Sequence, residues 1–401
     1  MSLALDGKIE SAYIGDKALN AIYVGNKLIY TGDKAPDLTV PLYFEAANPS
    51  VAVTIGFRKG STENTSDPSG VDFSKYTGYS DPAWSYSYDG LTWSNYSIGN
   101  NITIGGSNPS KVYFKSRTNY TAIPWRGQYT DSSSKLATTY YTFLQFTASG
   151  GNVKGGGNIQ SLLYSDFTAY DSALAYCYYY IFYGCTSLTK APELPATTLA
   201  NNCYYYMFYG CTSLTNAPAL PATTLADYCY YYMFDNCTSL TKAPELPATT
   251  LADYCYSNMF YGCTSLTNAP ALPATTLANN CYSNMFNNCK SLTSAPSLPA
   301  TTLANSCYQF MFFGCTSLTS APALPATTLV NNCYSNMFLL GIKANSTASA
   351  PCIYPYRIPE SGTGTDGETT GLTSMFADID GPGNFTPTIN TTFYTSVPVA
   401  N

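Results

Sequence analysis

The sequence predicts a multidomain protein in which N-terminal all-β modules are followed by an α/β solenoid of repeated rungs. Two observations support this fold class. A 26-residue unit recurs through the second half of the chain almost letter for letter. Residues 38–150, in contrast, hold short apolar segments separated by turn dipeptides. Repeats of this length indicate stacked rungs that bury their apolar faces against one another, whereas short, regularly spaced strands indicate a sandwich.

Residues 1–35 predict a small β-element. Residues 12–17 and 22–30 nearly duplicate each other, with Gly15-Asp16 and Gly25-Asn26 as turns. So few strands are not stable alone, so we expect this segment to attach to something larger. It resembles the N-terminal attachment modules of gut-phage tail and fibre proteins, which implies contact with other virion proteins.

Residues 36–150 predict an Ig-like β-sandwich. The turn signals are Asp89-Gly90, Gly105-Gly106 and Asn108-Pro109. The expected strands cover residues 42–46, 51–55, 84–88, 101–104 and 111–115. A glycine pair at 150–151 and a run of three glycines at 155–157 then indicate a hinge before the repeats, which we place at 151–345.

One rung, taken at residues 223–247, predicts a helix, a short strand and a turn. Apolar residues follow one another at steps of one and four between Leu225 and Cys237, the spacing of a buried helical stripe. Thr223 and Thr224 stand at the expected N-cap. Two prolines per rung limit any parallel strand to about residues 240–243. The expected left-handed caps at the far end are Gly210, Asn236, Gly262, Asn288 and Gly314.

The phrase Met-Phe-x-x-Cys-x-Ser-Leu-Thr, found at 259–267, resembles the bacterial surface-antigen (BspA-type) leucine-rich repeats. The resemblance covers roughly residues 161–345, and the prolines after Leu-Thr depart from the commoner members. It implies a curved solenoid used for adhesion or recognition. Residues 346–401 resemble a decayed last rung, and we expect them to form a C-terminal cap.

The cysteines follow the repeat and predict buried free thiols. Two cysteines eight residues apart on a helix lie about 12 Å apart, too far for a disulfide. Zinc is not expected either, because the chain has no Cys-x-x-Cys pair and no histidine. Only Cys352 lies outside the two columns, which are Cys177, Cys203, Cys229, Cys255, Cys281, Cys307 and Cys333, and Cys185, Cys211, Cys237, Cys263, Cys289 and Cys315.

Composition argues against several function classes. Charged residues make up 10% of the chain, the net charge is −6, and no basic cluster suits nucleic acid. Without histidine, and with acids that recur as parts of the repeat, we expect no enzyme and no cofactor. Residues 1–8 lack the apolar run of a signal peptide, and no stretch predicts membrane insertion.

Two sets of variable positions are candidates for a ligand or partner surface. Tyrosine offers a flat apolar face with a polar tip, which suits binding, although the same rings would suit packing on the sandwich or on a neighbouring subunit. Small polar side chains along the strand edge suit hydrogen bonding to a carbohydrate or peptide, or a solvated edge. The candidates are Tyr179, Tyr180, Tyr205, Tyr206, Tyr231 and Tyr232, and along the edge Lys190, Asn216, Lys242, Asn268, Ser294 and Ser320.

These features together predict a bacteriophage virion appendage protein, fibre-like, assembled in the host cytoplasm. We expect its N-terminal region to bind other virion proteins and its repeats to bind a host surface glycan or protein. We also expect the protein to form a homo-oligomer. The alternative is a bacterial cell-surface adhesin of the leucine-rich-repeat type, which would be extracellular.

Overall fold

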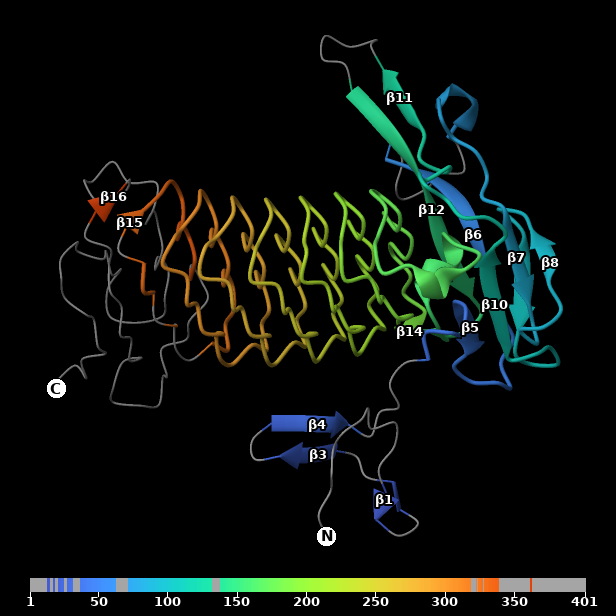
Figure 1. Ribbon diagram of the computed structural model, residues 1–401, viewed down its shortest axis with the longest axis horizontal. Helices are drawn as coiled ribbons and strands as arrows, with labels where there is room; N and C mark the ends of the chain where they lie inside the picture. Colours follow the sequence, from blue (N-terminus) through green and yellow to red (C-terminus); the bar gives the residue numbers. More distant parts are fainter. Residues whose placement is uncertain are drawn as a thin grey trace.

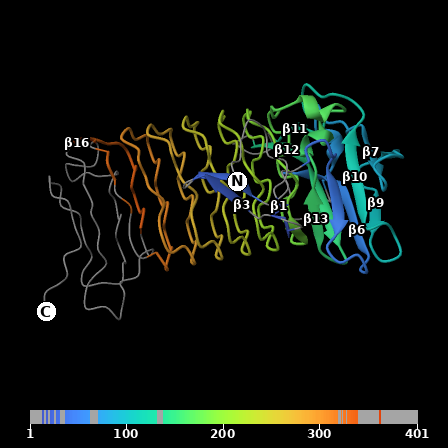
Figure 2. The same ribbon diagram turned by 60° about the horizontal axis from the view of Figure 1, so that its bottom comes forward.

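The protein consists of two β-sheets at one end and a row of stacked rungs that extends away from them (Figures 1 and 2). The computed structural model describes residues 37–62, 71–131, 138–318, 322, 324–326 and 328–338, and the backbone of five short strands outside these ranges. The predicted C-terminal cap, Ser320 and Cys352 therefore lie outside the described residues, apart from the two-residue strand β16 (Ser361–Gly362).

Ten strands form the two sheets. The six-stranded sheet has the order β14-β13-β5-β10-β7-β8 and the four-stranded sheet the order β11-β12-β6-β9. The first sheet contains β5 (Tyr43–Ala46), β7 (Trp84–Ser87), β8 (Ser94–Tyr96), β10 (Lys111–Ser116), β13 (Val153–Gly156) and β14 (Leu188–Lys190). The second contains β6 (Val53–Ser61), β9 (Asn101–Ile104), β11 (Gln128–Asp131) and β12 (Thr138–Ser149).

All five strands expected in 36–150 are present, because alternating residues supply a buried face. In β10, for example, Val112, Phe114 and Ser116 are buried while the residues between them are partly exposed. Sequence reasoning missed β8, β11 and β12, and it stopped the sheets too early. β13 and β14 lie after residue 150 and extend the six-stranded sheet to the first rung. Three short 3₁₀ turns complete this part: η2 (Phe73–Lys75), η3 (Ile159–Leu162) and η4 (Phe167–Ala169).

Aromatic rings fill the space between the sheets and continue into the repeats. Phe44 of β5 stacks on Phe146 of β12 with ring centroids 3.9 Å apart. Phe182, from the first rung, packs against both rings at 6.0 and 5.6 Å. The buried apolar residues of the sheets and of the rungs therefore form one continuous cluster.

The helix predicted in each rung is wrong. Where it was expected, the backbone makes successive four-residue turns, and no α-helix occurs among the described residues. Alternate N–H groups close local turns, as in Tyr179 to Tyr176. The N–H groups between them donate to the next rung: Tyr178 to Cys203 at 2.9 Å and Phe182 to Met207 at 3.0 Å. The fold class is therefore mostly strands and turns, without the α part of the expected α/β array.

Left-handed residues at every fourth position end these turns. In the first rung they are Tyr176, Tyr180 and Gly184, with φ of 60°, 61° and 66°. The predicted caps Gly210, Gly262 and Gly314 and the asparagines Asn236 and Asn288 do have positive φ, but they end a turn and not a helix. An apolar pattern that repeats every four residues looks helical over three turns, because an α-helix repeats every 3.6.

The predicted N-cap and strand positions have other roles. Thr224 is not a cap but bridges to Thr198 of the preceding rung. The strand expected near residues 240–243 is reduced in most described rungs to a single parallel bridge, such as Lys242 to Asn268, because prolines interrupt any longer ladder.

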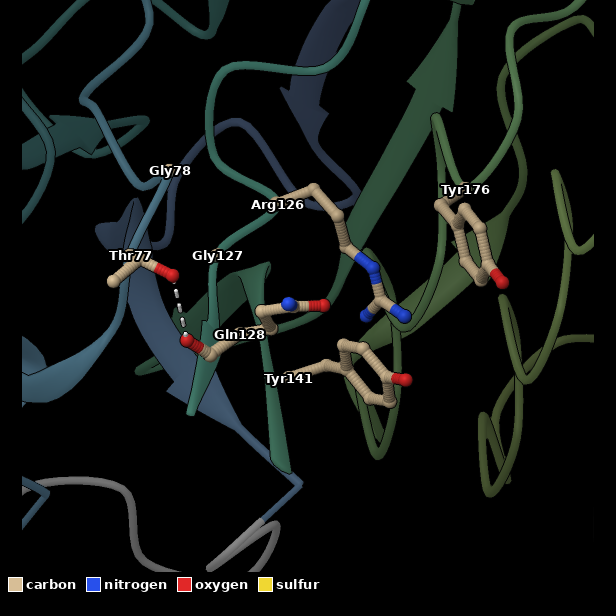
Figure 3. Close-up of a pocket in the computed structure, with 7 residues that line it drawn as sticks. All are labelled: Thr77, Gly78, Arg126, Gly127, Gln128, Tyr141 and Tyr176. Carbon is tan, nitrogen blue, oxygen red and sulfur yellow. Dashed lines mark hydrogen bonds between the residues drawn. The ribbon is translucent and has the colours of Figure 1, made fainter. Parts of the chain in front are cut away.

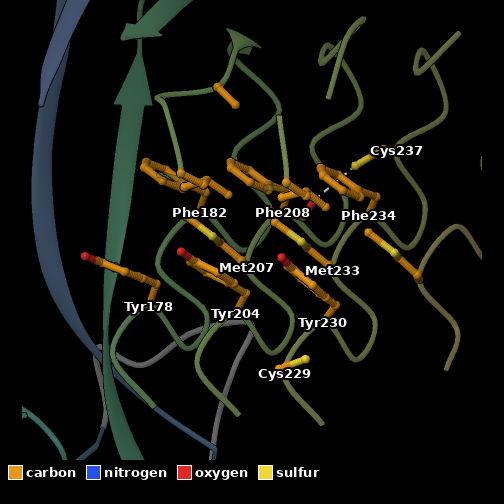
Figure 4. Close-up of a cluster of buried hydrophobic side chains, with 14 of the residues drawn as sticks. Tyr178, Phe182, Tyr204, Met207, Phe208, Cys229, Tyr230, Met233, Phe234 and Cys237 are labelled. Carbon is orange, nitrogen blue, oxygen red and sulfur yellow. Dashed lines mark hydrogen bonds between the residues drawn. The ribbon is translucent and has the colours of Figure 1, made fainter. Parts of the chain in front are cut away.

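Equivalent side chains stack in columns inside the rungs. Tyr178, Tyr204 and Tyr230 stack with centroids 5.6 Å apart, and a parallel column begins at Phe182 (Figure 4). Methionines such as Met207 lie between the two columns (Figure 4). The stacking of equivalent residues agrees with the 26-residue period.

The thirteen described cysteines are all buried, and none of them forms a disulfide. In the second column the thiol donates to the backbone carbonyl of a phenylalanine in the preceding rung: Cys237 Sγ lies 3.1 Å from Phe208 O. In the first column the contact is longer, 4.0 Å between Cys229 Sγ and Cys255 O. Burial raises the pKa of each thiol, which keeps it protonated and unreactive.

The N-terminal segment contains two antiparallel pairs, where short strands were expected. They are β1 (Tyr13–Ile14) with β2 (Lys17–Ala18), and β3 (Ala21–Val24) with β4 (Lys27–Thr31). At the other end, β15 (Thr328–Leu329) pairs in parallel with β16. Attachment through residues 1–35 and the four-part domain division remain predictions.

Candidate functional site

The tyrosine face, defined as Tyr179, Tyr180, Tyr205, Tyr206, Tyr231 and Tyr232, is a double row of stacked rings. In one row the centroids of Tyr179 and Tyr205, and of Tyr205 and Tyr231, lie 5.0 Å apart. In the other row, Tyr206 stacks on Tyr232 at 4.6 Å and an interplanar angle of 5°. The structure therefore brings all six predicted tyrosines together.

The second row is held by an uncommon backbone conformation. Tyr180, Tyr206 and Tyr232 have φ of 61°, 54° and 55°. The left-handed region costs an L-residue other than glycine or asparagine roughly 1–2 kcal/mol. Later rungs place Asn258 and Asn284 at this position, which tolerate the conformation more readily. Ring stacking along the row offsets the cost in the first three rungs.

The tyrosine face is less exposed than the sequence suggested. Tyr180 is only 8% exposed, so its predicted outward position is wrong. Phe143 of β12 covers it, with centroids 4.8 Å apart. Tyr179 packs beside the guanidinium group of Arg126, 4.7 Å from its ring centroid. The other four rings are half-buried and continue away from β12.

Later rungs replace the tyrosine pairs with hydrogen-bonded polar pairs. Ser257 and Asn258 are 2% and 6% exposed. Ser257 Oγ donates to Ser283 O at 3.1 Å and accepts from Asn258 Nδ2 at 2.9 Å. The same side-chain bond joins Asn284 to Ser283 at 3.1 Å. The aromatic character of this face is therefore confined to the rungs nearest the sheets, except for Phe310.

The polar row, defined as the predicted edge residues Lys190, Asn216, Lys242, Asn268 and Ser294, lies on the edge where the rungs bridge to one another. Asn216 bridges to Lys242, Lys242 to Asn268, and Asn268 to Ser294. Lys190, at the end of β14, is exposed like these four residues. The described members of this row are amides, a hydroxyl and two ammonium groups, all of which can form hydrogen bonds.

The electrostatics of the tyrosine face favour neutral phenols. Burial raises the pKa of Tyr179 to about 12, and the cationic Arg126 beside it lowers that pKa only in part. Burial also raises the pKa of Tyr205 and Tyr231. The described residues contain no group of three or more side chains suited to hold a metal ion. Such a face can bind through ring contacts and hydroxyl hydrogen bonds.

Sequence reasoning missed the residues of β12 and its neighbours that join the sheets to this face. Arg126, Phe143 and Gln145 all contact the first rung. A half-buried strand is recognised by apolar residues at every second position. In β12 the apolar residues Phe143 and Leu144 are adjacent, so this pattern is broken before Phe146 and the strand is not apparent from the sequence. Trp125-Arg126 within an otherwise charge-poor segment was the one available signal.

The comparisons identify the repeats. The family model for BspA-type leucine-rich repeat regions matches residues 166–283 and 230–349, in six copies. Searches among curated proteins and among solved structures give no significant match. Repeats of this type are typical of surface or extracellular proteins, are generally non-enzymatic, and suggest adhesion or protein binding. No helix in the described part of the chain is long and apolar enough to cross a membrane.

Proposed function

We propose that this protein, whose residues 166–349 carry BspA-type leucine-rich repeats, is a non-enzymatic recognition component of a bacteriophage virion appendage. Its repeat solenoid binds a host surface glycan or protein. The observation that carries the recognition role is the tyrosine face, a stacked aromatic surface confined to the rungs beside the sheets.

Stacked tyrosines suit recognition for a physical reason. A tyrosine provides a large contact area while fixing only two side-chain torsions, so binding costs little conformational entropy. Here neighbouring rings already restrict one another at 4.6–5.0 Å, so much of that entropy is lost on folding. The polar row supplies a second, separate candidate contact.

The virion role rests on thiol chemistry and on the N-terminal resemblance. Thirteen free thiols buried in the described residues suit folding in a reducing cytoplasm, where virions assemble. Residues 1–35 attach the protein to other virion proteins, and further copies complete a homo-oligomer. Immunogold labelling of purified phage particles tests this role, and deleting residues 1–35 should abolish incorporation while leaving the repeats folded.

The alternative is a bacterial cell-surface adhesin, which the BspA-type repeats favour. The two candidates differ in where the chain is found. Label on intact bacteria in the absence of phage, with none on particles, would replace the virion proposal with the adhesin.

The recognition surface is tested with variants that copy later rungs of the same array. Tyr205→Ser and Tyr231→Ser imitate Ser257 and Ser283, while Tyr206→Asn and Tyr232→Asn imitate Asn258 and Asn284. The fourfold variant should keep its melting temperature within a few degrees. Its binding to encapsulated bacterial strains, measured by flow cytometry of labelled protein, should fall at least tenfold.

A matched control comes from the polar row. Asn216→Ser and Asn268→Ser imitate Ser294 and leave the tyrosines intact. Unchanged cell binding by the tyrosine variant, together with an altered oligomer size, would assign the tyrosine face to an internal interface. Loss of binding in the polar-row control alone would move recognition to that edge.

A further inference from the structure

A pocket of about 470 Å³ opens where the sheets meet the first rung (Figure 3). Thr77, Gly78 and Gln128 line one side, and Tyr141 and Tyr176 the other. Thr77 and Gln128 exchange two backbone hydrogen bonds of 3.0 Å, which fixes that wall. Gly127, also in the lining, has no space for a side chain: an added Cβ would lie 2.9 Å from Cβ of Tyr79.

Arg126 extends into this pocket between the two aromatic rings (Figure 3). Its Cζ lies 4.0 Å from the ring centroid of Tyr141 and 4.1 Å from that of Tyr176. Its Nη1 atom is buried and has no hydrogen-bond partner. No carboxylate among the described residues forms an ion pair with Arg126, and none lines the pocket.

This arrangement is unusual for a guanidinium group. Removing a cation from water costs several kcal/mol unless it is paired. Cation–π contacts return roughly 0.5–2 kcal/mol each, and they leave Nη1 without a hydrogen-bond partner. Desolvation accordingly lowers the pKa of Arg126 from its usual value, although arginine remains protonated. The pocket presents a fixed positive charge to which no carboxylate of the described residues is paired.

We propose that the Arg126 pocket binds the carboxylate of an acidic sugar residue, a uronic or sialic acid. Guanidinium and carboxylate match in a two-pronged hydrogen-bonded pair, which gives both energy and orientation. The rest of the lining suits a sugar ring: two flat aromatic walls, the Gln128 amide and the Thr77 hydroxyl.

The pocket is continuous with the tyrosine face. Arg126 lies 4.7 Å from the ring of Tyr179, which stacks on Tyr205. An acidic glycan held by Arg126 therefore continues onto stacked rings, and the proposal rests on the recognition role proposed above. It narrows that role to a charged carbohydrate, with Arg126 selecting the charge.

The test compares ligands that differ only in the carboxylate. Isothermal titration of the full-length protein uses tetragalacturonate against its methyl ester, and sialyllactose against its methyl ester. We expect the acid form of at least one pair to bind at least tenfold more tightly than its neutral partner. Arg126→Gln should remove this preference, and Arg126→Lys should restore only part of it. Arg117→Gln, at an exposed arginine outside the pocket, is the control and should keep it.

The two ligand pairs distinguish a uronic acid from a sialic acid, because each pair contains only one of these acids. Equal binding of acid and neutral forms, or no binding of any of the four ligands, overturns the proposal. So does an Arg126→Gln protein that melts at a lower temperature but keeps the preference, because Arg126 would then only join β12 to the first rung. A peptide bound through its free C-terminal carboxylate, with no sugar bound, would replace the glycan with a protein ligand. None of these results depends on cell binding by the tyrosine variants, so the two proposals fail separately.

Discussion

At the scale of single residues, Asp235 is the most perturbed acid of the described rungs. It is 3% exposed, and burial raises the pKa of its carboxyl group to about 7. Other rungs carry Tyr209, Tyr261 or Asn287 at this position, so the repeat accepts a neutral group there. The carboxylate accepts a hydrogen bond from Asn236 Nδ2 at 2.6 Å, which an amide oxygen would accept equally well.

The first prediction is that Asp235→Asn stabilises the protein at alkaline pH. The folded state holds the proton of Asp235 more tightly than the unfolded state does. The stability that Asp235 contributes is therefore fully present below about pH 4 and is lost as the pH rises through about 7. The variant lacks this loss, and at pH 8 it should gain up to roughly 4 kcal/mol. Urea unfolding at pH 4 and pH 8 measures the effect. Glu245→Gln, on an exposed turn, is the control, and an equal gain at both pH values contradicts the titration account.

A second residue-scale prediction separates the two cysteine columns. Serine has a shorter side-chain bond than cysteine, so Cys237→Ser keeps its donor within reach of Phe208 O, whereas Cys229→Ser moves away from an already long contact. A buried hydroxyl without a partner costs about 1–3 kcal/mol. Cys229→Ser should therefore destabilise the protein more than Cys237→Ser in urea melts. The reverse order would show that packing, not hydrogen bonding, sets the cost.

At the scale of elements, β12 stands where an earlier rung would stand. Along the four-residue turns, the N–H groups of one rung donate to carbonyl groups of the next rung, so the turns of the first rung have carbonyl groups that no earlier rung can satisfy. Phe146 N donates to Ile181 O at 2.6 Å, and Gln145 Nε2 donates to Tyr183 O at 2.6 Å. Arg58 Nε in turn holds the Gln145 side chain at 2.9 Å. The strand therefore caps the array.

We predict that Gln145→Met weakens this junction by about 1–3 kcal/mol, because it removes the side-chain hydrogen bond from Gln145 Nε2 to Tyr183 O. Hydrogen exchange should speed up in β12 and the first rung and remain unchanged near Cys307. Gln309→Met, in a distal rung, is the matched control. Faster exchange spread evenly over all rungs would contradict a local capping role.

Period and topology were predictable to different degrees. Identical residues recur every 26 positions, which predicted that equivalent side chains lie next to one another in neighbouring rungs. Tyr178, Tyr204 and Tyr230 do stack in this way. The rung's path was not predictable from apolar spacing, since four-residue turns and helices give the same pattern over a dozen residues. Backbone signs were present, however: asparagine, glycine and tyrosine at every fourth position are weak helix formers. The Arg126 pocket joins residues from β11, β12 and the first rung, a proximity that no local pattern reports.

At the scale of the whole molecule, the single buried cluster from the sheets to the rungs sets how the protein unfolds. Repeat arrays often lose cooperativity because each rung contacts only its neighbours. Here the first rung shares Phe182 with the core of the sheets, at 6.0 Å from Phe44 and 5.6 Å from Phe146. The sheets and the array should therefore gain stability from each other across this joint.

The last prediction is that sheets and array unfold together, and that Phe182 couples them. The three tryptophans, Trp84, Trp93 and Trp125, all report on the sheets, whereas near-ultraviolet circular dichroism of the tyrosines is dominated by the stacked rungs. The two signals should share one midpoint in the wild type. Phe182→Ala should separate the two midpoints. Phe260→Ala, in the same column within the array, should lower stability by about 3–5 kcal/mol through a comparable cavity and shift both signals together, because Phe182 still couples the two parts. Coincident midpoints in Phe182→Ala would mean that the backbone bonds from β12, not the shared aromatic core, transmit the coupling.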